Sequence, residues 1–110
     1  LTDDQLKAIA QKNGVVQITL YNGFLRDDDQ EASIIDAMEH LDHAVELMGI
    51  DHVGIGSDFD GDGGVCGIAD SSEFINFTIQ LLRRKYSEKD IEKIWGGNWM
   101  RVMTRVQSVR

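Results

Sequence analysis

The sequence HVGIGSDFDG, at residues 52–61, joins a short apolar segment to a loop that is rich in glycine and aspartate. Residues 52–57 have the composition of a short β-strand, and Gly54 and Gly56 leave room for a neighbouring backbone or side chain to approach it closely. The loop that follows contains too much glycine and aspartate for regular structure. We therefore predict a strand that ends directly at the acidic side chain of Asp58.

A second strand is predicted earlier in the chain, at residues 15–21, where the sequence is VVQITLY. This segment is dense in β-branched residues and almost continuously apolar, which is typical of a strand covered on both faces in a parallel sheet. Between the two strands, apolar residues recur every three or four positions from about Gln30 to Met48, and Gly49 ends the pattern. A strand, an amphipathic helix and a strand in this order predict a parallel pair with a right-handed crossover.

Capping residues predict further helices on both sides of the strand pair. A Thr, Asp or Ser followed three residues later by Gln, Glu or Asp can satisfy the free amides at the start of a helix. We assign this role to three pairs: Thr2 with Gln5, Asp70 with Glu73, and Ser87 with Asp90. The predicted order is therefore helix, strand, helix, strand, helix, helix, which is an α/β fold.

The C-terminal segment is predicted to be helical with a break. Gly96 and Gly97 are expected to interrupt the helix that starts after Ser87, and Asn98 is expected to cap a last turn or two. These last turns contain Met100, Val102 and Val106. Large side chains at helical spacing are predicted to pack in the core or against a barrel. They are Trp95, Trp99, Met100 and Met103.

Two strands are too few for a stable parallel sheet, because both outer edges stay unpaired and one crossover helix covers little of the surface. Further strands are therefore expected from the rest of a longer chain, from a second fragment, or from a homo-oligomer that shares the sheet. The chain contains no proline and opens at Leu1 without an initiator methionine. We favour a longer chain, so that residues 1–110 form a fragment of a single domain that is incomplete on its own.

The composition excludes several classes of partner. Eleven Lys and Arg residues against nineteen Asp and Glu residues give a net charge of −8, which repels the phosphates of a nucleic acid. We expect no membrane span, because no apolar run approaches about 20 residues, and no signal peptide, because the first ten residues are acidic and amphipathic. Cys66 is the single cysteine, and without a histidine near it in sequence a thiol nucleophile is disfavoured. The cellular compartment stays undetermined.

Candidate binding residues follow the two strands, because ligands of parallel α/β folds bind beyond the carboxyl ends of the strands. Tyr21 and Asn22 follow the first strand, and Asp58 follows the second. A carboxylate held there with little water around it can take up a proton or hold a metal-bound hydroxide. The alternative is that Asp58 and Asp60 only bond to backbone amides and stabilise turns.

The acidic loop also allows a calcium interpretation. Asp58, Asp60 and Asp62, followed by Gly63, match the first half of a calcium-binding loop. The twelfth position, which requires a bidentate glutamate, is Ala69, and a strand precedes the loop where a helix is required. Weak calcium binding therefore remains only as an alternative.

The histidines are interpreted as structural or solvated residues. His40 and His43 lie one helical turn apart and could share a metal with Glu39 or Glu46. On a helical wheel, however, His43 falls opposite the apolar stripe and His40 lies to one side, so both are expected on the surface. His52 lies at the amino end of its strand, far from the expected site.

Several segments together resemble the C-terminal part of the membrane (renal) dipeptidase family. They are LTDDQL, LYNGFL, HLDHAVELMG, HVGIGSDFDG and LLRRKYSEKDIEKIWGGNWMRV, which occur in the same order as in that family and cover essentially the whole chain. The family belongs to the amidohydrolase superfamily of (β/α)8 TIM-type barrels. The resemblance implies that this chain supplies the last two strands of such a barrel with their flanking helices.

The resemblance also implies an activity, namely hydrolysis of dipeptides by two zinc ions that are bridged by a hydroxide. Asp58 matches the acidic residue that receives a proton from the hydroxide, passes it to the leaving amine and contacts the free amino group of the substrate. Tyr21 and Asn22 match positions that line the pocket, and Phe59 and Gly61 would shape it. Asn98 matches a residue that caps the last helix.

The zinc ligands of the family lie upstream of the point where this chain begins, as do its substrate-binding histidine and arginine. No metal ligand is therefore assigned to this chain, and alone it is expected neither to bind the zinc pair nor to catalyse. The remainder of the barrel is then its partner. A hypothesis of another class is a non-catalytic interaction or binding module that assembles through its open sheet edges.

Overall fold

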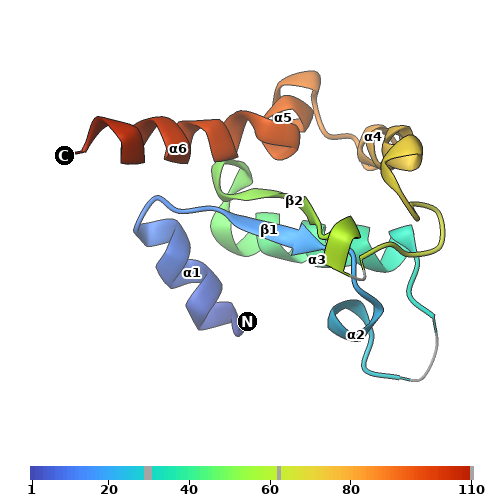
Figure 1. The fold of residues 1–110 in the computed structure, drawn as a ribbon. Coiled ribbons are helices and arrows are strands. Elements are labelled where there is room, and N and C mark those ends of the chain that lie inside the picture. The colour runs from blue at the N-terminus through green and yellow to red at the C-terminus, as the bar shows by residue number, and fades with distance from the viewer. Residues whose placement is uncertain (29–30, 62, 110) are drawn as a thin grey trace.

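The computed structural model describes residues 1–28, 31–61 and 63–109. Within this part of the chain, two strands and the helix between them form the centre (Figure 1). The elements up to the second strand are α1 (Asp3–Gln11), β1 (Val16–Thr19), α2 (Asn22–Leu25), α3 (Ile34–Met48), the 3-10 turn η1 (Ile50–His52) and β2 (Val53–Ser57). After it come η2 (Phe59–Gly61), η3 (Ser71–Glu73), α4 (Phe74–Arg83), α5 (Glu88–Glu92), the π-helix η4 (Lys93–Gly97) and α6 (Asn98–Ser108).

The strands pair in parallel, as the sequence predicts. Val16 lies opposite Val53 and Ile18 opposite Ile55, and a shift in register then places Thr19 opposite Ser57. The helix α3 makes the crossover between the two strands and begins at Ile34. Gln30, where this helix was expected to begin, lies outside the described residues.

The core lies between α3 and the sheet. Met38 and Leu41 of α3 are fully buried, as are Leu20 after β1 and Val53 in β2. The helix begins with a capping box in which the Ser33 hydroxyl accepts an amide hydrogen and the Asp36 carboxylate accepts from the Ser33 amide. The apolar stripe predicted from the spacing of residues therefore packs against the sheet as expected.

The prediction that both faces of β1 are covered is wrong for the described part of the chain. Ile18 is buried on the side of α3, whereas Gln17 is exposed on the other face. The Gln17 side chain lies across the sheet, and its amide donates to the Ile55 carbonyl oxygen at 3.2 Å. The strand thus alternates between an apolar face and a polar face. Its high content of β-branched residues had suggested that both faces are apolar.

The expected break in the last helix is also wrong. Residues Lys93–Gly97 form a π-helix that carries the chain without interruption from α5 into α6. Asn98 does not cap α6; its buried side-chain amide donates to the carbonyl oxygens of Ile50 at 2.7 Å and Val53 at 2.9 Å. Two backbone carbonyls thereby gain hydrogen-bond partners. The stabilisation from these two bonds is greater than that from a single helix cap.

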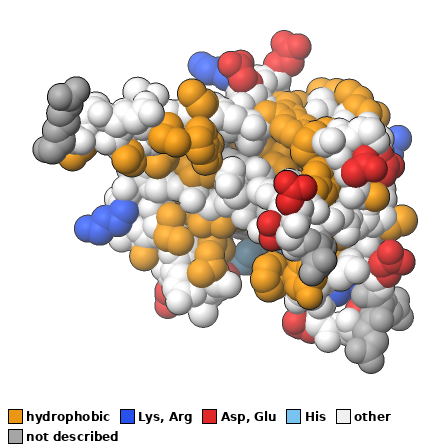
Figure 2. Space-filling model, viewed as in Figure 1, with side chains coloured by type: hydrophobic (Ala, Val, Ile, Leu, Met, Phe, Trp, Pro, Cys, Tyr) orange, Lys and Arg blue, Asp and Glu red, His pale blue; other side chains and the backbone are white. Residues whose placement is uncertain are grey.

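The end of α6 extends beyond the sheet, so part of its apolar face is not covered by the described residues (Figure 1). Trp99 and Met100 are 44% and 55% exposed, so they do not lie in the core of the described residues, and their packing against the rest of a barrel stays a prediction. Apolar side chains lie on the side of α6 that faces the sheet and gather again over α4 and α5 (Figure 2). Within the described part of the chain, no helix is both long and apolar enough for a membrane span.

Candidate functional site

Hydrogen bonds between backbones hold the loops that follow β1 and β2 side by side. The amide of Leu20 donates to the carbonyl oxygen of Ser57 at 3.1 Å, and the amide of Gly64 donates to that of Leu20 at 2.6 Å. Tyr21 and Asp58 therefore start from adjacent points at the same edge of the sheet. The structure brings the carboxyl ends of the two strands together, as the parallel arrangement requires.

A tight turn fixes the backbone of Asp58. Ser57 and Asp58 have φ angles of 32° and 66°, in the left-handed region that aspartate tolerates better than most residues. The carbonyl oxygen of Asp58 accepts hydrogen bonds from the amides of Gly61 at 2.9 Å and Gly63 at 2.8 Å. A strained backbone held by two hydrogen bonds at the end of a strand is a feature that often accompanies function.

Two glycines are required by the space around this turn. A Cβ atom on Gly61 would lie 2.7 Å from Oδ1 of Asp58, so any larger residue would displace the carboxylate. A Cβ atom on Gly63 would lie 2.3 Å from the carbonyl oxygen of Ser57. This oxygen belongs to the backbone and cannot move aside. The absence of a side chain at Gly61 therefore leaves the space that the Asp58 carboxylate occupies.

The side chain of Asp58 is exposed, which differs from the expectation of a carboxylate with little water around it. The described elements include two strands, β1 and β2. Among the described residues, the carboxylate of Asp58 is therefore not shielded from water.

On the other side of the site, Tyr21 and Phe24 form an edge-to-face aromatic pair with ring centroids 4.9 Å apart. Gly23 lies between them, where a Cβ atom would approach Cε1 of Tyr21 to 2.9 Å. The amide oxygen of Asn22 accepts a hydrogen bond from the backbone of Ala32 at 3.1 Å, which joins this loop to the segment before α3. Tyr21 is available to a ligand, whereas the amide oxygen of Asn22 already has a structural partner.

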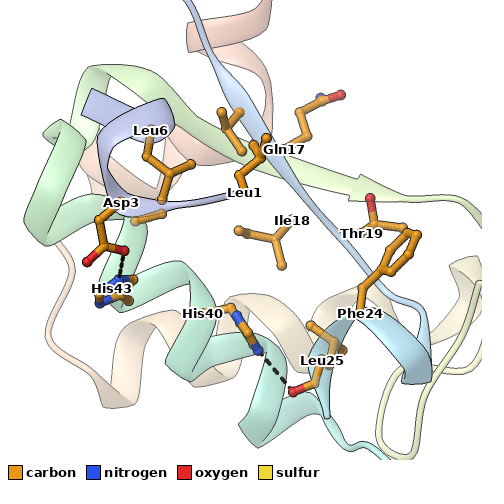
Figure 3. Close-up of a pocket in the computed structure, with 12 residues that line it drawn as sticks. Leu1, Asp3, Leu6, Gln17, Ile18, Thr19, Phe24, Leu25, His40 and His43 are labelled. Atoms are coloured by element: carbon orange, nitrogen blue, oxygen red, sulfur yellow. Dashed lines mark hydrogen bonds and ion pairs between the residues drawn. The ribbon is translucent and has the colours of Figure 1, made fainter. Parts of the chain in front are cut away.

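A hollow of about 550 Å³ lies elsewhere, along the free edge of β1 (Figure 3). Ile18 of β1 and Leu25 of α2 line it, together with residues of α1 and α3. None of the predicted site residues lines this hollow. The candidate site at the strand ends is therefore distinct from it.

The three histidines have structural partners. His40 lies 2.9 Å from the carbonyl oxygen of Leu25, and His43 lies 2.8 Å from a carboxylate oxygen of Asp3 (Figure 3). His52 lies in η1 and contacts the carbonyl oxygen of Gly14 at 2.9 Å through Nδ1. These contacts account for His40 and His43 on the surface of α3 without a metal.

A metal centre does not fit the described residues. Among residues 1–28, 31–61 and 63–109, no group of three or more His, Cys, Asp or Glu side chains could hold a metal ion. Asp62, the third carboxylate of the calcium interpretation, lies outside the described residues. The backbone of Cys66 pairs with that of Ser33 in one parallel β-bridge, and Cys66 itself is exposed and free.

The turn after β2 is supported by residues that no pattern in the sequence indicates. Phe59 packs against Phe74 at the start of α4, with ring centroids 5.3 Å apart. The short helix α2, which places Phe24 against Tyr21, was not predicted either. Four residues carry too little periodicity for a prediction, and the ring contacts depend on segments far apart in the sequence.

Comparison with known proteins places the similar chains in one family. The family model of membrane dipeptidase, peptidase family M19, matches residues 1–110. The chain is 37% identical over 109 residues to the dipeptidase aclJ of Aspergillus oryzae, and the match covers 97% of this chain and 26% of that protein. The chain spans from 25% to 40% of the length of four curated relatives it matches.

Solved structures of similar proteins give the same result. The structure of the probable dipeptidase PvdM from Pseudomonas aeruginosa matches with a TM-score of 0.87 and 27% identity, over 92% of this chain and 39% of that chain. A metallopeptidase from Rhodobacter sphaeroides, solved with a phosphinate mimic of the dipeptide L-Ala-D-Ala, matches with a TM-score of 0.83 and 36% identity. That match covers 90% of this chain and 29% of the other.

Proposed function

The chain belongs to the membrane dipeptidase family, peptidase family M19, and on this basis we propose that the intact protein that contains it hydrolyses the peptide bond of dipeptides. The matched relatives include dipeptidases, and one similar structure holds a mimic of L-Ala-D-Ala. The chain itself contributes the C-terminal part of the enzyme. Its fold and its strand-end site are consistent with this role.

The proposal for the fold is that residues 1–110 form the last two strands and flanking helices of a (β/α)8 barrel. Two parallel strands joined by a helical crossover are the repeating unit of such a barrel. The exposed polar face of β1 and the chain's share of its relatives' length both support a larger domain. Catalytic groups of such barrels lie at the carboxyl ends of the strands, where Asp58 is found.

The observation that carries the proposed mechanism is the position of Asp58, in a fixed turn directly after β2 and beside the loop after β1. In the proposed reaction its carboxylate takes a proton from the attacking water and gives it to the nitrogen of the leaving amine. The same carboxylate binds the free amino group of the dipeptide by charge. A carboxylate can serve as base and then as acid when it is held within hydrogen-bond reach of both atoms.

The pocket wall is proposed to consist of four further residues. The exposed Tyr21 ring provides an apolar and hydrogen-bonding surface, and Phe59 and Gly61 set the position of the turn that carries Asp58. Asn22 contributes by holding the loop through Ala32. The site would then bind a small, charged substrate between two short loops.

Zinc dependence is also part of the proposal, with two zinc ions bound by ligands outside this chain. The described residues do not form a metal centre, so this chain alone is expected to be inactive.

The experiment that tests the function uses the intact protein with L-Ala-D-Ala as substrate. We expect release of the two free amino acids, loss of this activity with a strong chelator, and its return when zinc is added. A zinc-loaded, folded protein that leaves a panel of dipeptides uncleaved would contradict the proposal.

A further inference from the structure

A continuous row of aromatic rings links the turn after β2 to the C-terminal helices. Phe59 lies 5.3 Å from Phe74, and Phe74 lies 5.2 Å from Trp95 in an edge-to-face arrangement with an interplanar angle of 86°. Trp95 also meets Phe77 edge-to-face at 5.9 Å. Such pairs stabilise beyond the area they bury and restrict the orientation of both rings.

Trp95 is held in place by a hydrogen bond as well as by its two ring contacts. Its indole Nε1 donates a hydrogen bond to Oγ1 of Thr78 at 2.8 Å. Phe77, against which it packs, is fully buried. One end of the row is therefore anchored in α4 and the core, and the other end carries Phe59.

The π-helix places Trp95 where it can make these contacts. Residues Lys93–Gly97 widen the helix locally, and Ile94 of this segment is buried. A Cβ atom on Gly54 would lie 3.4 Å from the Ile94 carbonyl oxygen, so the π-helix packs directly on β2. The same five residues therefore contact the strand that ends before Asp58. Trp95 reaches the turn that follows the strand only indirectly, through Phe74, which packs on Phe59. Single π turns within helices are often found at functional sites.

We propose that Trp95 is a positioning residue for Asp58, acting through Phe74 and Phe59. In the Phe59–Gly61 turn, the amide of Gly61 donates a hydrogen bond to the carbonyl oxygen of Asp58. The position of Phe59 therefore fixes the backbone from which the Asp58 carboxylate extends. This inference rests on the proposed role of Asp58. A general base displaced by about 1 Å loses much of its effect, and rate constants then fall on the order of 10²-fold.

The test compares Trp95→Leu with Trp99→Leu in the intact protein. Trp99 is the other tryptophan, is 44% exposed and takes part in none of the ring pairs found among the described residues. We expect Trp95→Leu to lower kcat for L-Ala-D-Ala by about tenfold or more with KM changed by less than about twofold, and Trp95→Phe to restore most of kcat. Trp99→Leu is expected to keep wild-type kinetics.

Hydrogen exchange gives a readout that does not depend on activity. In Trp95→Leu, the amides of Gly61 and Gly63 should exchange faster, because their bonds to Asp58 are loosened, while the amides of α3 keep their wild-type rates. The double variant Phe59→Leu/Trp95→Leu should have about the same kcat as the more impaired single variant, since both changes break one row of contacts.

Three results would overturn the inference: wild-type kcat in Trp95→Leu, equally faster exchange throughout the molecule, or additive effects of the Phe59 and Trp95 substitutions on kcat. An Asp58→Asn variant separates this inference from the proposed function. If Asp58→Asn loses turnover while Trp95→Leu keeps it, only the positioning role of Trp95 is wrong. If Asp58→Asn keeps turnover, the role of Asp58 itself is wrong.

Discussion

The side-chain amide of Asn98, in the first turn of α6, donates to the backbone carbonyl of Val53 at 2.9 Å and so ties the C-terminal helix to the first residue of β2. A second bond from the same nitrogen reaches the Ile50 carbonyl at 2.7 Å. The Asn98 side chain is buried, so water cannot replace these bonds. The last helix and the strand that carries Asp58 are thus connected through one residue.

Replacement of Asn98 by Ala is predicted to destabilise the intact protein by about 2–4 kcal/mol, because two carbonyl groups lose a buried partner. Urea unfolding of the intact protein measures this change. Ser108→Ala is the control, because the Ser108 hydroxyl bonds to the Arg105 carbonyl at an exposed position. A loss below about 0.5 kcal/mol for Asn98→Ala would show that the connection is unimportant.

Gly61→Ala is predicted to lower kcat/KM for dipeptides by about tenfold or more, because the added methyl group would push the Asp58 carboxylate from its position. Gly96→Ala is a matched control, since a Cβ atom there would meet nothing within 4 Å. That control is expected to keep its activity, because the added methyl group would meet no atom. Equal kinetics in both variants would contradict the steric role of Gly61.

The environment of Tyr86 predicts how the stability of the folded protein depends on pH. Its hydroxyl donates to Asp42 at 2.6 Å, and burial together with this carboxylate raises the pKa of Tyr86 well above the usual 10.0. The folded protein therefore keeps the phenol proton that the unfolded chain releases, so this contribution to stability is present below about pH 10 and is lost as the pH rises further.

Unfolding measured between pH 8 and pH 11 tests this prediction by comparing the wild-type intact protein with Tyr86→Phe. The free energy of unfolding should fall less steeply in Tyr86→Phe above about pH 10. Tyr21→Phe, which removes the hydroxyl of a partly exposed tyrosine, is measured in parallel as the control for a tyrosine-to-phenylalanine change. Identical slopes for wild type and Tyr86→Phe would refute the contribution of Tyr86.

The chain expressed alone is predicted to bind no zinc pair, to cleave no dipeptide and to aggregate, or to be recovered only with an upstream fragment of the same protein. The hollow along the edge of β1 and the exposed apolar side chains of α6 leave apolar surface uncovered among the described residues. Size-exclusion chromatography and thermal melting check this. A discrete oligomer that melts cooperatively would instead favour the alternative of an interaction module.

Features that depend on neighbouring residues in the sequence were predicted well. The capping box of Thr2 and Gln5 and the cap of Ser87 on Asp90 are present, because they use residues three positions apart. The parallel pairing of the strands also follows from the order of the elements. Local hydrogen bonds and hydrophobic periodicity can be predicted without knowing the rest of the fold.

Features that depend on distant segments were not predicted. The π-helix at Lys93–Gly97 and the inward turn of Asn98 are set by contacts with β2. The place of the candidate site, beyond the strand ends, was expected from the sequence, but the aromatic support of Phe59 by Phe74 was not. The exposure of Asp58 also differs from expectation, because burial is decided by elements on every side of a residue.

The central claim is that Asp58 carries the proton in dipeptide hydrolysis. The most direct measurement is kcat for L-Ala-D-Ala in Asp58→Asn, with Asp60→Asn as control and the metal content determined in the same samples. We predict that Asp58→Asn loses about 10²-fold or more of kcat with its metal retained, while Asp60→Asn stays near wild type. Wild-type turnover by a folded, metal-loaded Asp58→Asn variant would contradict the account.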